Sequence, residues 1–112
     1  MMKRGDKLYV ITRRDLTPGY QAVQSIHAAQ QFALEHPSIN REWHEQSNYL
    51  SLLSVEDEHA LKELGVEAVH RGLAISGFWE PDIVWGLTAI VIEPGKKSER
   101  LLKRLPLALS EY

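Results

Sequence analysis

Residues 7–29 read KLYVITRRDLTPGYQAVQSIHAA, a pattern typical of a buried strand that leads through a short loop into a helix. Apolar side chains occupy both alternating faces of the strand around Val10, which predicts an inner strand covered on both sides. Thr17 and Pro18 suit the N-cap and the first position of the helix. Ligands of open α/β sheets bind where strand carboxyl ends meet helix amino ends, so we expect a functional site at this junction.

The helix that begins near Pro18 is expected to carry two rows of side chains. One row predicts an apolar stripe packed against the sheet and consists of Ala22, Val23, Ile26, Ala29, Ala33 and Leu34. The second row lies beside it and consists of Tyr20, Gln24 and His27. Gln24 and His27 are candidate site residues; the alternative is that both are boundary residues hydrogen-bonded to the backbone.

The rest of the chain predicts alternating helices and strands. Capping residues and apolar periodicity predict helices over residues 39–46 and 56–71 and near the C-terminus, and strands over 48–55, 73–80 and 86–93. Too few residues join the last two strands for a crossover helix, so these strands should form an antiparallel pair. The expected fold is one α/β domain over residues 1–112, with three α/β/α layers and a mixed four-stranded sheet.

The composition is that of an ordinary globular domain, with 44% hydrophobic and 25% charged residues. The chain has no Cys, which excludes disulfides, thiolate catalysis and cysteine-ligated metals. The His residues lack metal-ligand spacing and no glycine-rich phosphate motif is present, so we expect no metal and no other cofactor. Without a long apolar run or a signal-peptide pattern, a cytoplasmic protein with no membrane partner is expected.

The net charge of -2 argues against a surface that binds nucleic acid everywhere, but the basic residues concentrate at the two ends of the chain. One group consists of Lys3, Arg4, Lys7, Arg13 and Arg14, and the other of Lys96, Lys97, Arg100, Lys103 and Arg104. A fold that brings the ends together would form one phosphate-binding face. The alternative is that the second group is only the solvated side of the C-terminal helix.

One combination of residues is more specific than any of its parts. It comprises Arg13, Asp15 and Leu16 after the first strand, then Gly19, Ala22, Gln24, His27, Ala28 and Ala29 in the helix. In this combination the chain resembles the type 2 peptidyl-tRNA hydrolases, the archaeal and eukaryotic kind, and the resemblance extends more weakly over the whole chain. It implies the same α/β fold, tRNA as the partner, and hydrolysis of the ester between a peptide, or an N-blocked amino acid, and the terminal ribose of tRNA.

The resemblance also implies roles for individual residues. His27 and Gln24 would order the site, and Glu80 or Asp82 would orient the attacking water. Thr88 matches a family hydroxyl position and would contact the substrate or the oxyanion. The end of the tRNA would be held by Arg13 and Arg14, and the C-terminal basic residues that extend the phosphate-binding face are Lys96, Lys97 and Arg100.

Two positions depart from the family pattern. Tyr20 stands where the family has a Lys after the glycine, and residues 80–86 form a shorter link than the family loop. Tyr20 can donate a hydrogen bond but carries no positive charge at neutral pH. Loss of a cation near a developing oxyanion costs several kcal/mol of transition-state stabilisation. The sequence therefore leaves a second function open, a tRNA- or ligand-binding module on the same fold that does not hydrolyse its ligand.

Two tryptophans flank this short link, Trp79 and Trp85. Their indoles suit stacking on bases or on a terminal adenosine. The alternative is that they cap the hydrophobic core or lie in a dimer interface, and an open sheet edge with exposed tryptophans would also favour a homodimer.

Overall fold

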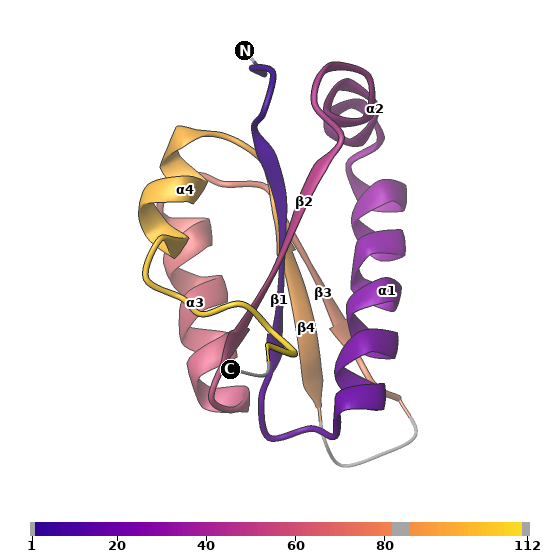
Figure 1. Ribbon diagram of the computed structural model, residues 1–112, viewed down its shortest axis with the longest axis vertical. Coiled ribbons are helices and arrows are strands. Elements are labelled where there is room, and N and C mark those ends of the chain that lie inside the picture. The colour runs from indigo at the N-terminus through magenta and orange to yellow at the C-terminus, as the bar shows by residue number, and fades with distance from the viewer. Residues whose placement is uncertain (1, 82–85, 111–112) are drawn as a thin grey trace.

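The computed structural model describes residues 2–81 and 86–110 (Figure 1). The elements in chain order are β1 (Lys7–Arg13), α1 (Pro18–Glu35), α2 (Pro37–Gln46), β2 (Tyr49–Val55), α3 (Glu58–His70), β3 (Ile75–Trp79), β4 (Leu87–Ile92) and α4 (Lys96–Leu102). Helices α1 and α2 lie on one side of the sheet, and α3 and α4 lie on the other (Figure 1). The predicted α/β class with a mixed four-stranded sheet is confirmed.

The sheet has the strand order β2-β1-β4-β3. β1 is parallel to β2 and antiparallel to β4, and β3 is antiparallel to β4. The predicted antiparallel pair of the last two strands is therefore confirmed. β1 lies inside the sheet, and its residues from Leu8 to Arg13 are all buried, as the apolar residues on both faces of this strand predicted.

Alternating residues of the central strands pack into two separate hydrophobic cores, one on each face of the sheet. Toward α1, the buried residues are Leu8, Val10, Ala28, Phe32, Ala89 and Val91. Toward α3 and α4, they include Tyr9, Ile11, Leu53, Leu61, Ala68, Ile90 and Leu102. This two-residue period follows from the strand pleat, which points successive side chains to opposite faces.

The predicted apolar stripe of α1 is wrong. The residues that this helix buries are Gln21, Gln24, Ser25, Ala28 and Phe32, whereas Val23, Ile26 and Leu34 are 49%, 64% and 77% exposed. Phe32 supplies the large apolar contact with the sheet, and the small side chains of Ser25 and Ala28 allow the helix to approach the strands closely. The buried polar side chains are tolerated because they bond locally: Gln21 Nε2 donates to the Leu16 carbonyl at 2.8 Å, and Ser25 Oγ donates to the Gln21 carbonyl at 2.6 Å.

Local signals set the two ends of α3, which was predicted over residues 56–71. The Asp57 side chain accepts from the Ala60 amide at 2.9 Å and caps α3. Gly72, with φ of 75°, follows the end of the same helix in the left-handed region that glycine tolerates. At α1, Pro18 takes the first position as expected, but Thr17 makes no side-chain capping bond.

Gly86, the residue before β4, has a backbone conformation that few other residues tolerate. Its φ is 62°, and a methyl group added there would overlap the carboxylate of Glu58. We predict that Gly86→Ala lowers the free energy of unfolding by about 1–3 kcal/mol, measured by urea denaturation. Because Glu58 also accepts from the Leu87 amide, Glu58→Ala has a cost of its own, so the overlap is measured by a double-mutant cycle: Gly86→Ala should cost less in the Glu58→Ala background than in the wild type.

Gly19→Ala is the matched control for this substitution. Gly19 lies in the first turn of α1, and a methyl group added there meets no atom within 4 Å. The control should leave stability unchanged or raise it slightly. Equal effects of the two substitutions would contradict the assignment of strain to Gly86.

Candidate functional site

Two polar residues of α1 contact the face of the edge strand β3 near its carboxyl end. Gln24 Nε2 donates to Glu80 Oε2 at 2.8 Å. One turn later, the His27 ring stacks on Phe78, with ring centroids 4.5 Å apart and planes 8° from parallel. Both contacts come from α1, so Phe78 in β3 and Glu80 just after it face the same side of the sheet. The structure therefore brings three of the expected site residues together: Gln24, His27 and Glu80.

The exposures of Gln24 and His27 differ sharply. Gln24 is only 1% exposed, and its Oε1 has no hydrogen-bond partner among the described residues. A carboxylate can only accept hydrogen bonds, so Glu80 fixes which end of the Gln24 amide faces it. His27 is exposed beside its ring contact. Gln24 therefore holds Glu80 in position, while His27 is accessible to a ligand.

The other expected catalytic positions differ in accessibility. Tyr20 is exposed one turn before Gln24 on α1. Thr88 is fully buried, and its hydroxyl donates to the Phe78 carbonyl at 3.2 Å. The Thr88 hydroxyl therefore supports the strand that carries Phe78 instead of facing solvent, where a substrate would meet it. Asp82, the alternative to Glu80, lies outside the described residues.

Arg13 was expected to hold tRNA, but it is 7% exposed and serves the fold. Its Nε and Nη2 donate to the two Asp15 carboxylate oxygens at 2.9 and 2.8 Å, and its Nη1 donates to the Leu87 carbonyl at 3.0 Å. Hydrogen bonding by Asp15 raises the pKa of Arg13, and the same bonds lower the pKa of Asp15. Because the Arg13 guanidinium is buried and bonded to Asp15 and Leu87, it is not placed to bind a tRNA phosphate.

Glu58 holds the other polar group of Leu87. Its Oε2 accepts from the Leu87 amide at 2.8 Å and lies 3.4 Å from Lys62 Nζ. The Leu87 amide is the main cause that lowers the pKa of Glu58, with Lys62 and Arg13 adding to the effect. Both backbone groups of Leu87 are therefore bonded to side chains, and we call Arg13, Glu58 and Leu87 the Leu87 clamp. Sequence reasoning missed Glu58, since only its place in the first turn of a helix distinguished it.

A hollow of about 490 Å³ lies where β1 and β2 end and α1 begins. Its lining includes Arg14, Pro18, Gln21, Ser54 and Leu107. Arg14 is exposed, and its Nη1 donates to both the carbonyl and the hydroxyl of Ser54, at 3.2 and 3.1 Å. The strand–helix junction at which the sequence predicted a site is thus hollow, and Arg14 gives it a positive charge.

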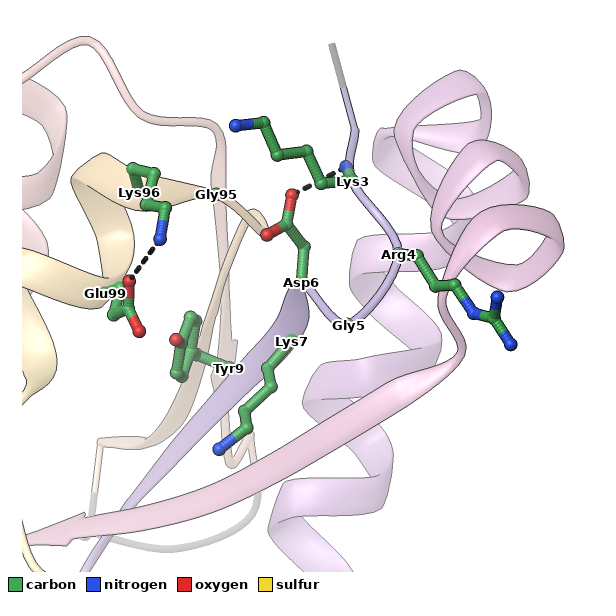
Figure 2. A pocket seen from close by; sticks show the side chains of 9 residues that line it. All are labelled: Lys3, Arg4, Gly5, Asp6, Lys7, Tyr9, Gly95, Lys96 and Glu99. Carbon is green, nitrogen blue, oxygen red and sulfur yellow. Dashed lines mark hydrogen bonds and ion pairs between the residues drawn. The ribbon is translucent and has the colours of Figure 1, made fainter.

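The expected single basic face forms only in part, since Lys3, Arg4 and Lys7 of the first group line one hollow with Lys96 of the second (Figure 2). β4 runs antiparallel to β1, with Ile92 opposite Tyr9 and Ala89 opposite Thr12, so α4 begins at the end of the sheet away from Arg14 (Figure 1). A seven-residue strand is roughly 20 Å long, and this length separates Arg13 and Arg14 from α4. Within α4, Lys96 pairs with Glu99 and Lys97 donates to the Arg71 carbonyl, while Arg100 is exposed.

Trp79 points to the face of β3 opposite Phe78 and Glu80. It is exposed, and Lys62 Nζ lies 5.4 Å from the centroid of its ring. Together with Val66 and Val69 of α3, it lines a mostly apolar groove of about 480 Å³. Trp79 is therefore a surface residue and does not cap the core, and Trp85 lies outside the described residues.

The comparisons with known proteins bear on the fold alone. No family model and no curated protein matches the sequence. A solved structure of the protein of unknown function Atu0240 from Agrobacterium tumefaciens is similar, with a TM-score of 0.65 and 13% sequence identity. The match covers 96% of this chain and 98% of the other, so it extends over the whole domain.

The part of the chain that the structure describes has neither a cluster of metal ligands nor a membrane-spanning helix. In residues 2–81 and 86–110, no three His, Asp or Glu side chains are grouped so that they could hold a metal ion. Within the same ranges, no helix has both the length and the apolar character that a membrane span requires.

Glu58 in the Leu87 clamp makes the free energy of unfolding depend on pH. Because the folded-state pKa of Glu58 is lowered, its contribution is complete above the pKa of the unfolded chain, about 4.3, and is lost as pH falls through the folded value. We predict that the free energy of unfolding falls between about pH 5 and pH 3, and that Glu58→Gln reduces this fall. Denaturant titrations across that range measure it.

Glu63→Gln is the control for the Glu58 substitution. Glu63 lies on the same helix, is well exposed and contacts His59 at 3.5 Å. Its substitution should leave the pH dependence as in the wild type. If the free energy of unfolding of Glu58→Gln falls with pH as much as that of the wild type, the pH dependence does not come from the Leu87 clamp.

Proposed function

We propose that the protein is a peptidyl-tRNA hydrolase-like esterase that cleaves the ester between a peptide, or an N-blocked amino acid, and the 3′-terminal ribose of tRNA. The observation that carries the proposal is the hydrogen bond between Gln24 and Glu80 beside the stacked His27. These residues lie far apart in sequence, and the resemblance to type 2 peptidyl-tRNA hydrolases had assigned them to one site. The nearby hollow with Arg14 gives the nucleotide end of the substrate a place to bind.

In this mechanism Glu80 is the general base. It takes a proton from a water molecule whose oxygen attacks the ester carbonyl carbon. Gln24 donates to the Glu80 carboxylate and keeps it aimed at the water. The tetrahedral intermediate then expels the ribose oxygen, which receives the proton, and the products are the free peptide acid and tRNA with an intact ribose.

Two exposed side chains complete the proposed site. Tyr20 donates a hydrogen bond to the developing oxyanion, and His27 contacts the ribose or the acyl group. An ester is more reactive than an amide, so one positioned water, one base and one neutral donor meet the chemical need. Arg14 binds a phosphate near the 3′ end, and few cations surround it, so binding should fall only modestly as salt rises.

A binding module without hydrolysis is the second candidate, and two observations favour it. Tyr20 brings no positive charge to the position where the family has Lys. Arg13 is occupied by Asp15 and Leu87, which removes it from the surface that faces the ligand. Both features weaken stabilisation of an oxyanion more than they weaken binding of a neutral ester.

The two candidates differ in single-turnover hydrolysis of N-acetylaminoacyl-tRNA. For the hydrolase, Glu80→Gln should slow cleavage by at least about 100-fold with tRNA affinity nearly unchanged, because the amide cannot take the proton. Tyr20→Phe should slow it about tenfold or more, and Tyr20→Lys should restore or exceed the wild-type rate. Glu45→Gln, on the exposed face of α2, is the control and should have no effect.

Filter binding of the same tRNA separates the outcomes. Binding without cleavage, even with Tyr20→Lys, supports the binding module. Absence of both binding and cleavage contradicts both candidates. Cleavage by Glu80→Gln at the wild-type rate removes Glu80 from the mechanism.

A further inference from the structure

The outer edge of β3 is an open strand edge. β3 is the last strand of the sheet, and no strand in the described part of the chain pairs with its outer side. The Glu80 amide donates to the Gly86 carbonyl, so the backbone groups of the even-numbered residues along this strand face β4. Those of the odd-numbered residues point outward, as the Ile75 carbonyl shows by accepting from His36 Nε2 at 2.9 Å.

Gly77 and Trp79 supply the outward backbone groups between Ile75 and the candidate base. Gly77 has no side chain, which lets another backbone approach closely. An extended peptide binds such an edge by adding a strand, and its main-chain hydrogen bonds give affinity. His36 already occupies the Ile75 carbonyl, so the stretch from there to Glu80 holds about three residues of an added strand.

The apolar groove described above lies along the same edge, on the α3 side of the sheet. Its lining includes Ile75, Gly77 and Trp79 of β3, and Val66 and Val69 of α3. The two valines are each 57% exposed and Trp79 is 55% exposed, so large apolar side chains are grouped on one surface. Grouped apolar side chains mark a binding surface, whereas single ones do not. Every second side chain of an added strand points into this groove.

The position of the candidate base fixes which part of a substrate meets the open edge. Glu80 directly follows β3, and the hollow with Arg14 lies at the ends of β1 and β2. In the sheet order β2-β1-β4-β3, two strand spacings, or roughly 10 Å, separate β1 from β3. An ester whose carbonyl is next to Glu80 and whose nucleotide is toward Arg14 therefore has its peptide beside the open edge.

We propose that the peptide part of the substrate binds as an extended strand parallel to β3. The peptide is joined to the ribose by its carboxyl end, and β3 also runs toward Glu80, so the two chains run in the same direction. Gly77 and Trp79 bond to the peptide backbone, and one side chain enters the apolar groove. The inference rests on the proposed function and specifies the substrate class, a peptide of about three residues with an apolar side chain at one position.

Single-turnover hydrolysis of tRNA that carries one or three residues tests this site. At limiting enzyme, the ester of an N-acetylated tripeptide should be cleaved at least about tenfold faster than that of a single N-acetylated amino acid, because it gains backbone hydrogen bonds. Extension to six residues should add little. Exchange of leucine for aspartate at the second or the third residue from the ester should slow cleavage at one of these positions and not at the other, because successive side chains point to opposite faces.

Substitution of the groove valines tests the apolar contact. The double variant Val66→Ser, Val69→Ser should reduce the rate advantage of the tripeptide severalfold, because both side chains contact the peptide. Val23→Ser is the matched control. Val23 is 49% exposed on α1, which lies on the other side of the sheet, and its substitution should leave the advantage unchanged (Figure 1).

A binding measurement separates the peptide site from the esterase. The N-acetylated tripeptide acid, which is the product of cleavage, is titrated into the ¹⁵N-labelled protein. Saturable shifts are expected at the amide resonances of Gly77 and Trp79. The Leu50 amide of β2, at the opposite edge of the sheet, should not shift.

Three results would overturn the inference. Equal rates for one and three residues would do so while leaving the esterase intact, as would absence of saturable shifts at Gly77 up to about 10 mM peptide, an affinity too weak for a specific site. Shifts at Gly77 that follow protein concentration without peptide, with a dimer in sedimentation, would assign the edge to a second copy. Shifts at Gly77 with peptide but no cleavage of either ester would contradict the esterase and support the peptide site.

Discussion

The main-chain groups of Leu87 are the point on which the candidate site depends. Arg13 donates to the Leu87 carbonyl and Glu58 accepts from the Leu87 amide, so three elements, β1, α3 and β4, meet at one residue. Asp15 completes the arrangement by neutralising the buried guanidinium. Because the side-chain partners are charged, each bond is stronger than one between neutral groups. The start of β4 is therefore fixed in space.

This fixed point bears directly on Glu80. The Glu80 amide donates to the Gly86 carbonyl at 3.0 Å, next to Leu87, so the ends of β3 and β4 are tied together just where the candidate base lies. Gln24 and His27 then contact this strand end from α1. A general base needs a fixed position more than it needs a strong charge, and this scaffold supplies the position.

The local features of the fold were readable from the sequence, because their causes are local. The inner strand β1 and the helix α3, which was predicted over residues 56–71, each follow from residues within a few positions. The inward face of α1 was not predictable in this way, because apolar residues occur around most of that helix. Packing of Phe32 against the sheet sets which face of the helix is buried. The role of Arg13 also escaped prediction, since its carbonyl partner lies 74 residues away in sequence.

Hydrogen exchange in Arg13→Met tests the central claim most directly. Methionine keeps much of the side-chain volume but removes the donor to the Leu87 carbonyl. If the Leu87 clamp holds the site, exchange of the Glu80 and Leu87 amides should accelerate at least about tenfold more than exchange of Val91 in the middle of β4. Equal acceleration at all three amides, or none at Glu80, would contradict the claim that the clamp positions the candidate base.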